Sequence, residues 1–193
     1  MDKLAIFVSG SGTNMENLIR EIKAGRILTS AAVVICDKPG AAAIQKAENL
    51  QVPVALIDRK KFTSKEEFEA AINRELDKVK IDWILLAGFM RILSTEFVRR
   101  YKGKIINIHP SLLPKFPGVH GIRDAYEAKV KETGVTVHFV DEGVDTGPII
   151  LQRTLVVNAG ETLESLEARV HELEYKIYPE ALRLVLSGKV SFK

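Results

Sequence analysis

A short segment near the middle of the chain combines an amide, an imidazole and two prolines, Asn107-Ile108-His109-Pro110-Ser111-Leu112-Leu113-Pro114. It follows Lys104-Ile105-Ile106, which is typical of the end of a strand. Because side chains alternate between the two faces of a strand, Asn107 and His109 are expected to point the same way. Such a pair can hold a carbonyl oxygen that gains negative charge, and it can also move a proton. On these residues alone, a polar strand end with an ordinary turn is an equally good interpretation.

The pattern of the whole chain predicts the elements that position this pair. Apolar runs predict strands over residues 4–8, 31–36, 53–57, 83–87 and 104–108. Amphipathic stretches between them predict helices over residues 14–24, 41–49, 65–79 and 95–101. In the second half, residues 134–140 and 149–157 predict an antiparallel, hairpin-like extension, followed by a long helix from about Thr162. We therefore expect an α/β fold, a Rossmann-like, open, mostly parallel sheet with helices on both faces and an antiparallel extension in the C-terminal half. No linker is visible, which predicts a single domain over residues 1–193.

Composition narrows the class of protein. Of the 193 residues, 46% are hydrophobic and 27% are charged, which is typical of a soluble globular chain. The formal net charge of +3 is too small to argue for a nucleic-acid partner. The first apolar run, residues 4–8, is too short for a signal peptide, and no run approaches the ~20 residues of a membrane span. We therefore expect a cytoplasmic protein without membrane or metal partners, since the sequence has no Cys cluster and no His-Glu-x-x-His.

A glycine-rich loop follows the first predicted strand, Ser9-Gly10-Ser11-Gly12-Thr13-Asn14. In an open α/β sheet ligands bind at the carboxyl ends of the strands, and glycines let the backbone approach an anion there. This indicates a phosphate site, with a tight turn as the alternative. A dinucleotide fingerprint competes, because Asp37 ends the second strand and could bind a ribose. Met15 stands where the third glycine would be, so a nucleotide-binding oxidoreductase is the weaker reading.

Further candidate residues lie at other strand ends and on the long helix. Gly88–Leu93 leaves a buried strand and suits a flat heteroaromatic ligand, although it could simply lead into a helix. Asp145 lies on a loop bent by glycines, where its carboxylate can orient or charge a histidine, or merely cap the loop. His171 and Glu174 are three residues apart on one helix face, which could meet a substrate amine or ribose or be plain surface. His138 is interpreted as an ordinary strand histidine.

Four segments together resemble the phosphoribosylglycinamide formyltransferases, a folate-dependent family of purine synthesis. They are the loop at 9–14, Leu86–Leu93, Asn107–Pro114 and Asp145–Ile149. The resemblance spans nearly the whole chain. It implies transfer of the formyl group of 10-formyltetrahydrofolate, as co-substrate, to the amine of glycinamide ribonucleotide, and it implies small-molecule substrates for a monomer or homodimer. Formyltetrahydrofolate hydrolase and methionyl-tRNA formyltransferase share the central motif but normally carry an additional domain.

The resemblance also assigns roles to the matching positions. It implies catalytic roles for Asn107, His109 and Asp145. It implies that the ribonucleotide contacts Gly12, Thr13, Asn14, His171 and Glu174. It implies that the folate contacts Lys65, Met90, Arg91, Ile92, Leu93, Asn107, Asp141 and Val144. This chain departs from the family at Lys65, where arginine is often found, and a lysine cannot make the same planar fork.

Overall fold

The computed structural model describes residues 1–192, and the chain divides into two compact units. The first unit is Met1–Ile106, and the second begins at Asn107. The expectation of a single domain over residues 1–193 stays a prediction. Among residues 1–192, no helix is both long enough and apolar enough to cross a membrane.

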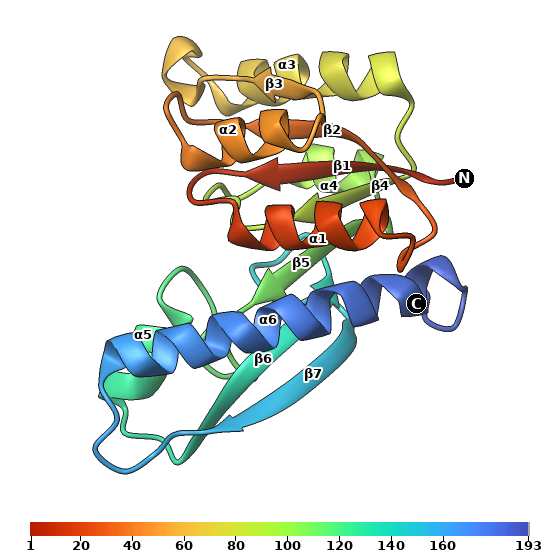
Figure 1. The fold of residues 1–193 in the computed structure, drawn as a ribbon. Helices are drawn as coiled ribbons and strands as arrows, with labels where there is room; N and C mark the ends of the chain where they lie inside the picture. The colour runs from red at the N-terminus through yellow and green to blue at the C-terminus, as the bar shows by residue number, and fades with distance from the viewer. Residues whose placement is uncertain (193) are drawn as a thin grey trace. The chain divides into compact units, whose positions relative to one another are not determined.

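The first unit is built on a parallel sheet (Figure 1). Its strands are β1 (Lys3–Val8), β2 (Ser30–Cys36), β3 (Val54–Leu56) and β4 (Trp83–Leu86). Strand β1 pairs with β2 on one side and with β4 on the other, and β3 pairs with β2. Leu4 to Val8 are all buried, as continuous apolar strands are when both faces of the sheet are covered. The parallel sheet predicted from the alternating pattern is therefore confirmed.

The helices of this unit lie on both faces of its sheet. They are α1 (Thr13–Lys23), α2 (Ala42–Asn49), α3 (Lys65–Val79) and α4 (Thr95–Arg100), with the short 3₁₀ helix η1 (Arg59–Lys61) before α3. Figure 1 shows α1 and α2 on one face and α3 and α4 on the other. Ser64 caps α3 by accepting a hydrogen bond from the Glu67 N–H at 3.1 Å. That bond fixes the first turn of α3, where Lys65 lies.

The second unit combines an antiparallel strand pair with one long helix (Figure 1). Its elements are the end of β5 (Ile105–His109), α5 (Gly121–Glu127), β6 (Glu132–Phe139), β7 (Ile149–Val156) and α6 (Leu163–Leu186). Strands β6 and β7 pair in an antiparallel register, and α6 packs on both. The hydrogen-bonded order of the seven strands is β3-β2-β1-β4-β5-β6-β7, so β5 begins in the first unit and ends in the second. The predicted mostly parallel α/β fold with an antiparallel extension is confirmed.

Gly134 is the position where the β6–β7 pair leaves least room for a side chain. A Cβ there would lie 2.1 Å from the Arg153 carbonyl oxygen and 2.6 Å from Leu112 Cδ2. We expect Gly134→Ala to lower the free energy of unfolding by about 1–3 kcal/mol, because the clash falls on backbone that cannot move aside. Urea denaturation measures the loss, with Gly10→Ala as the control, since a Cβ at Gly10 meets nothing within 4 Å. Equal midpoints for the two variants would contradict the expectation.

Candidate active site

The Asp145 carboxylate, on the loop between β6 and β7, is the point where polar groups of the second unit meet. Its Oδ2 accepts a hydrogen bond from the Gly118 N–H at 2.8 Å and lies 3.6 Å from His109 Nδ1. Its Oδ1 accepts a bond from Asn107 Nδ2 at 3.5 Å and lies 3.7 Å from His138 Nε2. The structure thus brings together the three residues expected to be catalytic, and it adds His138 to them. Their catalytic role stays a prediction.

Strand β5 supplies Asn107 and His109, which lie two residues apart and face the same carboxylate. His109 is buried, and its Nε2–H donates to the Phe116 carbonyl at 2.7 Å, while Nδ1 faces Asp145. An imidazole donates at both nitrogens only as the cation. Because His109 has an acceptor near each nitrogen, the arrangement suits the cationic ring, which can later release a proton.

His138 belongs to this cluster, although the sequence suggested only a strand histidine. It is buried on β6, and its Nδ1–H donates to the Phe139 carbonyl at 2.8 Å. In the neutral ring Nε2 is then an acceptor, and Asn107 Nδ2 lies 3.2 Å from it. His138 thus orients the Asn107 amide so that its nitrogen, rather than its oxygen, faces the cluster. The alternation of side chains along residues 134–140 indicates which face of the strand carries His138. The residues that contact His138 depend on how the strands pair, which the sequence does not show.

The loop that carries Asp145 is held in place by its own contacts. The Asp141 carboxylate accepts bonds from the Gly143 N–H at 3.1 Å and the Thr146 hydroxyl at 2.7 Å. A Cβ at Gly147 would lie 1.9 Å from the Phe139 carbonyl oxygen, so only glycine fits there. Asp141, expected as a folate contact, is therefore already a structural acceptor within the loop. Val144, the other folate candidate of this loop, is 48% exposed.

Asp145 keeps its negative charge in spite of burial. Burial alone would raise the pKa of the carboxyl, but the neighbouring His138, the hydrogen bond from the Gly118 N–H and the nearby His109 outweigh it. The pKa of Asp145 is therefore lower than its usual value. An ionised carboxylate beside two imidazoles can orient them and stabilise a cationic ring.

The glycine-rich loop of the first unit turns sharply at Gly12. The φ of Gly12 is 69°, and a Cβ there would lie 2.6 Å from Ala43 Cβ. Glycine is thus required for α1 to approach α2, whether or not an anion binds. Helix α1 begins at Thr13 without a side-chain cap, which suits the start of the helix for an anion. Ribonucleotide binding by Gly12, Thr13 and Asn14 stays a prediction.

The segment after β4 presents apolar side chains from an anchored backbone. Met90 and Ile92 are 60% and 69% exposed. The Met90 N–H donates to Ser9 Oγ at 2.9 Å, and Arg91 Nε donates to Asp37 Oδ2 at 2.6 Å. Asp37, which the dinucleotide interpretation needed for a ribose, is therefore engaged by Arg91. Folate binding by this segment stays a prediction.

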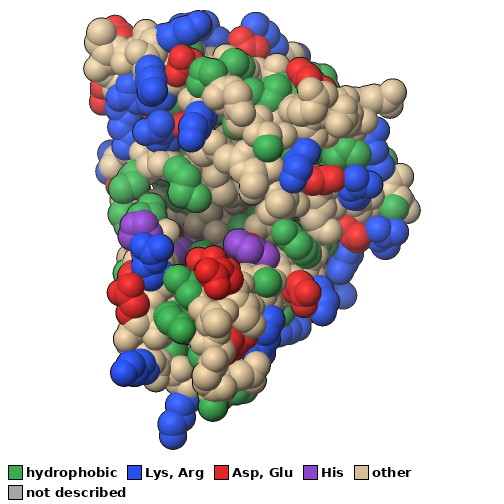
Figure 2. All heavy atoms as spheres, turned by 60° about the vertical axis from the view of Figure 1, so that its left-hand side comes forward, with side chains coloured by type: hydrophobic (Ala, Val, Ile, Leu, Met, Phe, Trp, Pro, Cys, Tyr) green, Lys and Arg blue, Asp and Glu red, His purple; other side chains and the backbone are tan. Residues whose placement is uncertain are grey.

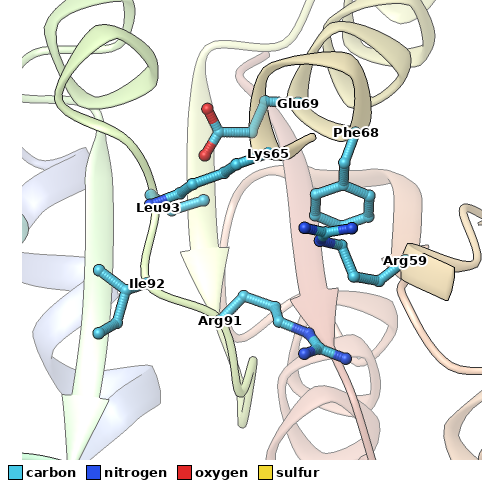
Figure 3. A pocket seen from close by; sticks show the side chains of 7 residues that line it. All are labelled: Arg59, Lys65, Phe68, Glu69, Arg91, Ile92 and Leu93. Atoms are coloured by element: carbon cyan, nitrogen blue, oxygen red, sulfur yellow. The ribbon is translucent and has the colours of Figure 1, made fainter. Parts of the chain in front are cut away.

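Lys65 lines one cavity with the last residues of that segment. Figure 3 shows its lining side chains, which come from η1, from the first turns of α3 and from residues 91–93. Lys65, Arg91, Ile92 and Leu93 were all expected to contact folate, and the structure brings these four together. Figure 2 shows Lys and Arg side chains gathered over the first unit on the face turned forward. The sequence did not single out Arg59, which also lines this cavity.

His171 and Glu174 form a pair on α6, as their spacing predicted. His171 Nδ1 lies 2.8 Å from Glu174 Oε2, and this hydrogen bond raises the pKa of the half-exposed His171. Their contact with a ribonucleotide stays a prediction. Within the described part of the chain, no three His, Cys, Asp or Glu side chains are grouped as a metal site requires.

Comparison with known proteins gives one consistent result. The family model described as "Formyl transferase" matches residues 2–182. Phosphoribosylglycinamide formyltransferase of Bacillus subtilis is 44% identical over 186 residues, which are 96% of this chain and 95% of that protein. The trifunctional purine biosynthetic protein adenosine-3 of Gallus gallus is 46% identical over 188 residues, 97% of this chain but 19% of that protein.

Solved structures agree with these relatives. Phosphoribosylglycinamide formyltransferase from Bacillus halodurans superposes with a TM-score of 0.94 at 44% identity, covering 98% of this chain and 97% of that one. Glycinamide ribonucleotide transformylase 1 from Geobacillus kaustophilus gives a TM-score of 0.94 at 49% identity, covering 96% and 99%. The similarity in sequence and in fold therefore covers both units.

The lowered pKa of Asp145 predicts a pH-dependent contribution to stability. Because the folded-state pKa lies below the unfolded value of about 3.9, the charge stabilises the fold above that pH. The contribution is lost as the pH falls through the folded value. We expect Asp145→Asn to be less stable than the wild type near neutral pH and the gap to narrow in acid. Urea unfolding of both proteins at neutral and at acidic pH measures the difference in their free energies of unfolding. A difference that does not change with pH would contradict the expectation.

The His171–Glu174 pair predicts a titration that one substitution should shift. We expect Glu174→Gln to lower the pKa of His171 towards the ordinary value of about 6.5, because the amide carries no charge to hold the imidazolium. An NMR titration of the ring protons measures the shift, and the other three of the four histidines serve as internal references. An unchanged His171 titration would show that Glu174 is not its partner in solution.

Proposed function

Because this chain belongs to the formyl transferase family, we propose that it transfers the formyl group of 10-formyltetrahydrofolate to the amine of glycinamide ribonucleotide. Family membership implies a folate-derived formyl donor, and the relatives named above support a place in purine biosynthesis. The observation that carries the proposal is the convergence of the Asn107 amide and the His109 imidazole on the Asp145 carboxylate. We also propose a cytoplasmic location and small-molecule substrates.

In the proposed reaction the neutral substrate amine attacks the formyl carbon, and the carbonyl oxygen becomes an oxyanion. Donors must then be within reach of that oxygen. Asn107 Nδ2 has its bond to Asp145 at 3.5 Å, which is long and readily exchanged for a bond to the oxyanion. The Nε2–H of His109 can turn from the Phe116 carbonyl to the same oxygen. Both donors are held in place before substrate arrives, which lowers the cost of reorganisation.

The proton balance of this reaction needs one group that both gives and takes a proton. His109, as the cation, gives its proton to the departing folate nitrogen when the C–N bond breaks. The neutral ring then takes the proton that the former amine nitrogen loses as it becomes an amide. Asp145 stabilises the cationic state, because it carries the opposite charge 3.6 Å from Nδ1. Asp145 and His138 therefore serve as positioning residues in this scheme.

Binding roles are proposed for each unit by itself. In the first unit, the folate would contact Lys65 and the segment Met90–Leu93, and the ribonucleotide phosphate would lie at Gly12–Asn14. In the second unit, Asn107 and the Asp141–Asp145 loop would contact the folate, and the His171–Glu174 pair would contact the glycinamide end. Glu174, buried and hydrogen-bonded to His171, is suited to accept a bond from an amine.

Replacement of His109 is the direct test of this proposal. We expect His109→Ala to lower kcat/KM for formyl transfer by about 10²–10³, because a charged donor to the oxyanion and the proton carrier are lost together. The assay follows the absorbance change as 10-formyltetrahydrofolate loses its formyl group in the presence of glycinamide ribonucleotide. A rate within a few-fold of the wild type would remove His109 from the reaction.

Two controls keep this test specific. His120→Ala removes an exposed histidine of the same unit whose side chain makes no capping hydrogen bond to α5. This variant should keep the wild-type rate. The wild type is also assayed without the ribonucleotide. Turnover only with the ribonucleotide supports transfer to its amine, whereas equal turnover without it would identify water as the acceptor and favour a formyltetrahydrofolate hydrolase.

A further inference from the structure

The chain between β5 and α5, called here the 110–120 segment, forms no helix or strand, yet it supplies two backbone groups to the cluster around Asp145. The Phe116 carbonyl accepts a bond from His109 Nε2–H at 2.7 Å, and the Gly118 N–H donates to Asp145 at 2.8 Å. Phe116 has a φ of 53°, in the left-handed region that residues with a side chain rarely adopt. Such a conformation persists only where the surrounding structure holds it.

Thr136, buried on β6, makes the first contact that holds this segment. Its hydroxyl donates to the Ser111 carbonyl at 2.7 Å and accepts a bond from the Leu113 N–H at 3.1 Å. One side chain thus satisfies both a donor and an acceptor of the segment's backbone. Because alternate residues of a strand share a face, Thr136 faces the same way as His138. The face of β6 that contributes His138 to the cluster therefore also binds the 110–120 segment.

Gln152 of β7 completes this contact from the neighbouring strand. It lies opposite Thr136 in the antiparallel pair of β6 and β7 (Figure 1). Its Nε2 donates to Thr136 Oγ1 at 2.8 Å and to the Leu113 carbonyl at 3.1 Å. A side-chain amide has two N–H groups, and a hydroxyl has one donor and two acceptor sites. All of these sites are used, and a fully satisfied network of this kind favours a single arrangement.

Ser111 extends the series of bonds towards the carbonyl that contacts His109. Its N–H donates to the His109 carbonyl at 2.9 Å, and its hydroxyl donates to the Lys115 carbonyl at 2.6 Å. The Lys115 carbonyl belongs to the planar peptide that joins Lys115 to Phe116, so this bond fixes the start of Phe116. An unbroken series of hydrogen bonds thus runs from β7 to that peptide.

We propose that Gln152 is a positioning residue for formyl transfer, because its amide holds the segment whose Phe116 carbonyl orients the His109 ring. This assignment rests on the proposed function, which gives His109 its part in the reaction. Gln152 touches neither substrate in this role and acts only through the segment. Its two N–H groups are what the position requires, since both of its partners are acceptors. A hydrocarbon side chain of similar length would leave the Leu113 carbonyl without this donor.

A purely structural role is the competing explanation, since a buried carbonyl needs a donor in any protein. The two explanations differ in how a broken bond affects the rate. A structural role predicts the same fractional loss of rate whether or not His109 is present. A positioning role predicts a loss that depends on His109, because the segment acts on the reaction through that ring.

The test uses Gln152→Met and Thr136→Val, which remove the amide and the hydroxyl while nearly keeping the volume of each side chain. We expect each variant to lower kcat about tenfold, because the His109 ring loses its orientation, and to leave the KM of both substrates unchanged. Thr136→Ser keeps the hydroxyl and should recover the wild-type kcat. In a His109→Ala background, Gln152→Met should lower the rate no further.

Gln45→Met is the matched control, because it removes an amide whose bond to Asn49 is exposed on α2. This variant should keep the wild-type kcat. Urea unfolding of every variant measures stability separately from rate. Since Gln152→Met and Thr136→Val break the series of bonds at different side chains, either folded variant tests the proposal by itself.

NMR of the imidazole N–H groups gives a second measurement, which needs no turnover. The Phe116 carbonyl holds the His109 Nε2–H, so this proton should exchange slowly with water in the wild type. We expect Gln152→Met to speed the exchange. The His138 Nδ1–H should not change, because it is bound to the Phe139 carbonyl within β6.

Three results would overturn the assignment of Gln152. A wild-type kcat in Gln152→Met would show that the amide is not needed, and an equal loss of rate with and without His109 would show a structural role. Unchanged exchange of the His109 N–H would show that the segment does not depend on Gln152. If the wild type transfers no formyl group but Gln152→Met still speeds the exchange, the proposed function fails alone. If the wild type transfers the group and Gln152→Met changes neither rate nor exchange, the assignment of Gln152 fails alone.

Discussion

An ionised carboxylate that is mostly removed from water must be given protein donors in place of hydration, and this requirement organises the second unit around Asp145. Its side chain is 13% exposed, and four groups surround its two oxygens. Loss of any one leaves the charge under-compensated, which costs more than the bond itself contributes. The end of β5, the register of β6 and the bend at Gly147 must therefore all be correct at once for the carboxylate to be stable. Because two of these groups, Asn107 and His109, are also proposed to act on the formyl group, the stability of the unit and its chemistry depend on one arrangement.

The first unit repeats this principle with a different pair. Asp37, at the end of β2, is buried, and Arg91 compensates it from the segment after β4. The bond fixes the backbone on which Met90 and Ile92 are exposed. A buried charge that must be paired thus anchors the loop that is proposed to contact the folate.

Local patterns predicted what depends on neighbours in the sequence. The strands, the helices and the common face of Asn107 and His109 all follow from the periodicity of the sequence. His138 was missed, because its contact with Asn107 depends on how a strand 31 residues away lies in the sheet. The Asp37–Arg91 bond spans 54 residues and was missed for the same reason. Arg59 was not singled out either, because only the folded chain places its guanidinium beside the Phe68 ring.

Two short hydrogen bonds of the cluster involve backbone groups, and residue types in a sequence do not indicate such bonds. The Phe116 carbonyl engages His109 Nε2, and the Gly118 N–H engages Asp145, so one short loop satisfies both members of the pair. A substrate oxyanion that accepts the hydrogen bond of His109 Nε2–H must replace the Phe116 carbonyl. Because a carbonyl is neutral and an oxyanion is charged, the exchange favours the oxyanion only once charge has developed. The loop therefore orients the imidazole in the ground state through the Phe116 carbonyl, and the stronger hydrogen bond, to the oxyanion, forms only in the transition state.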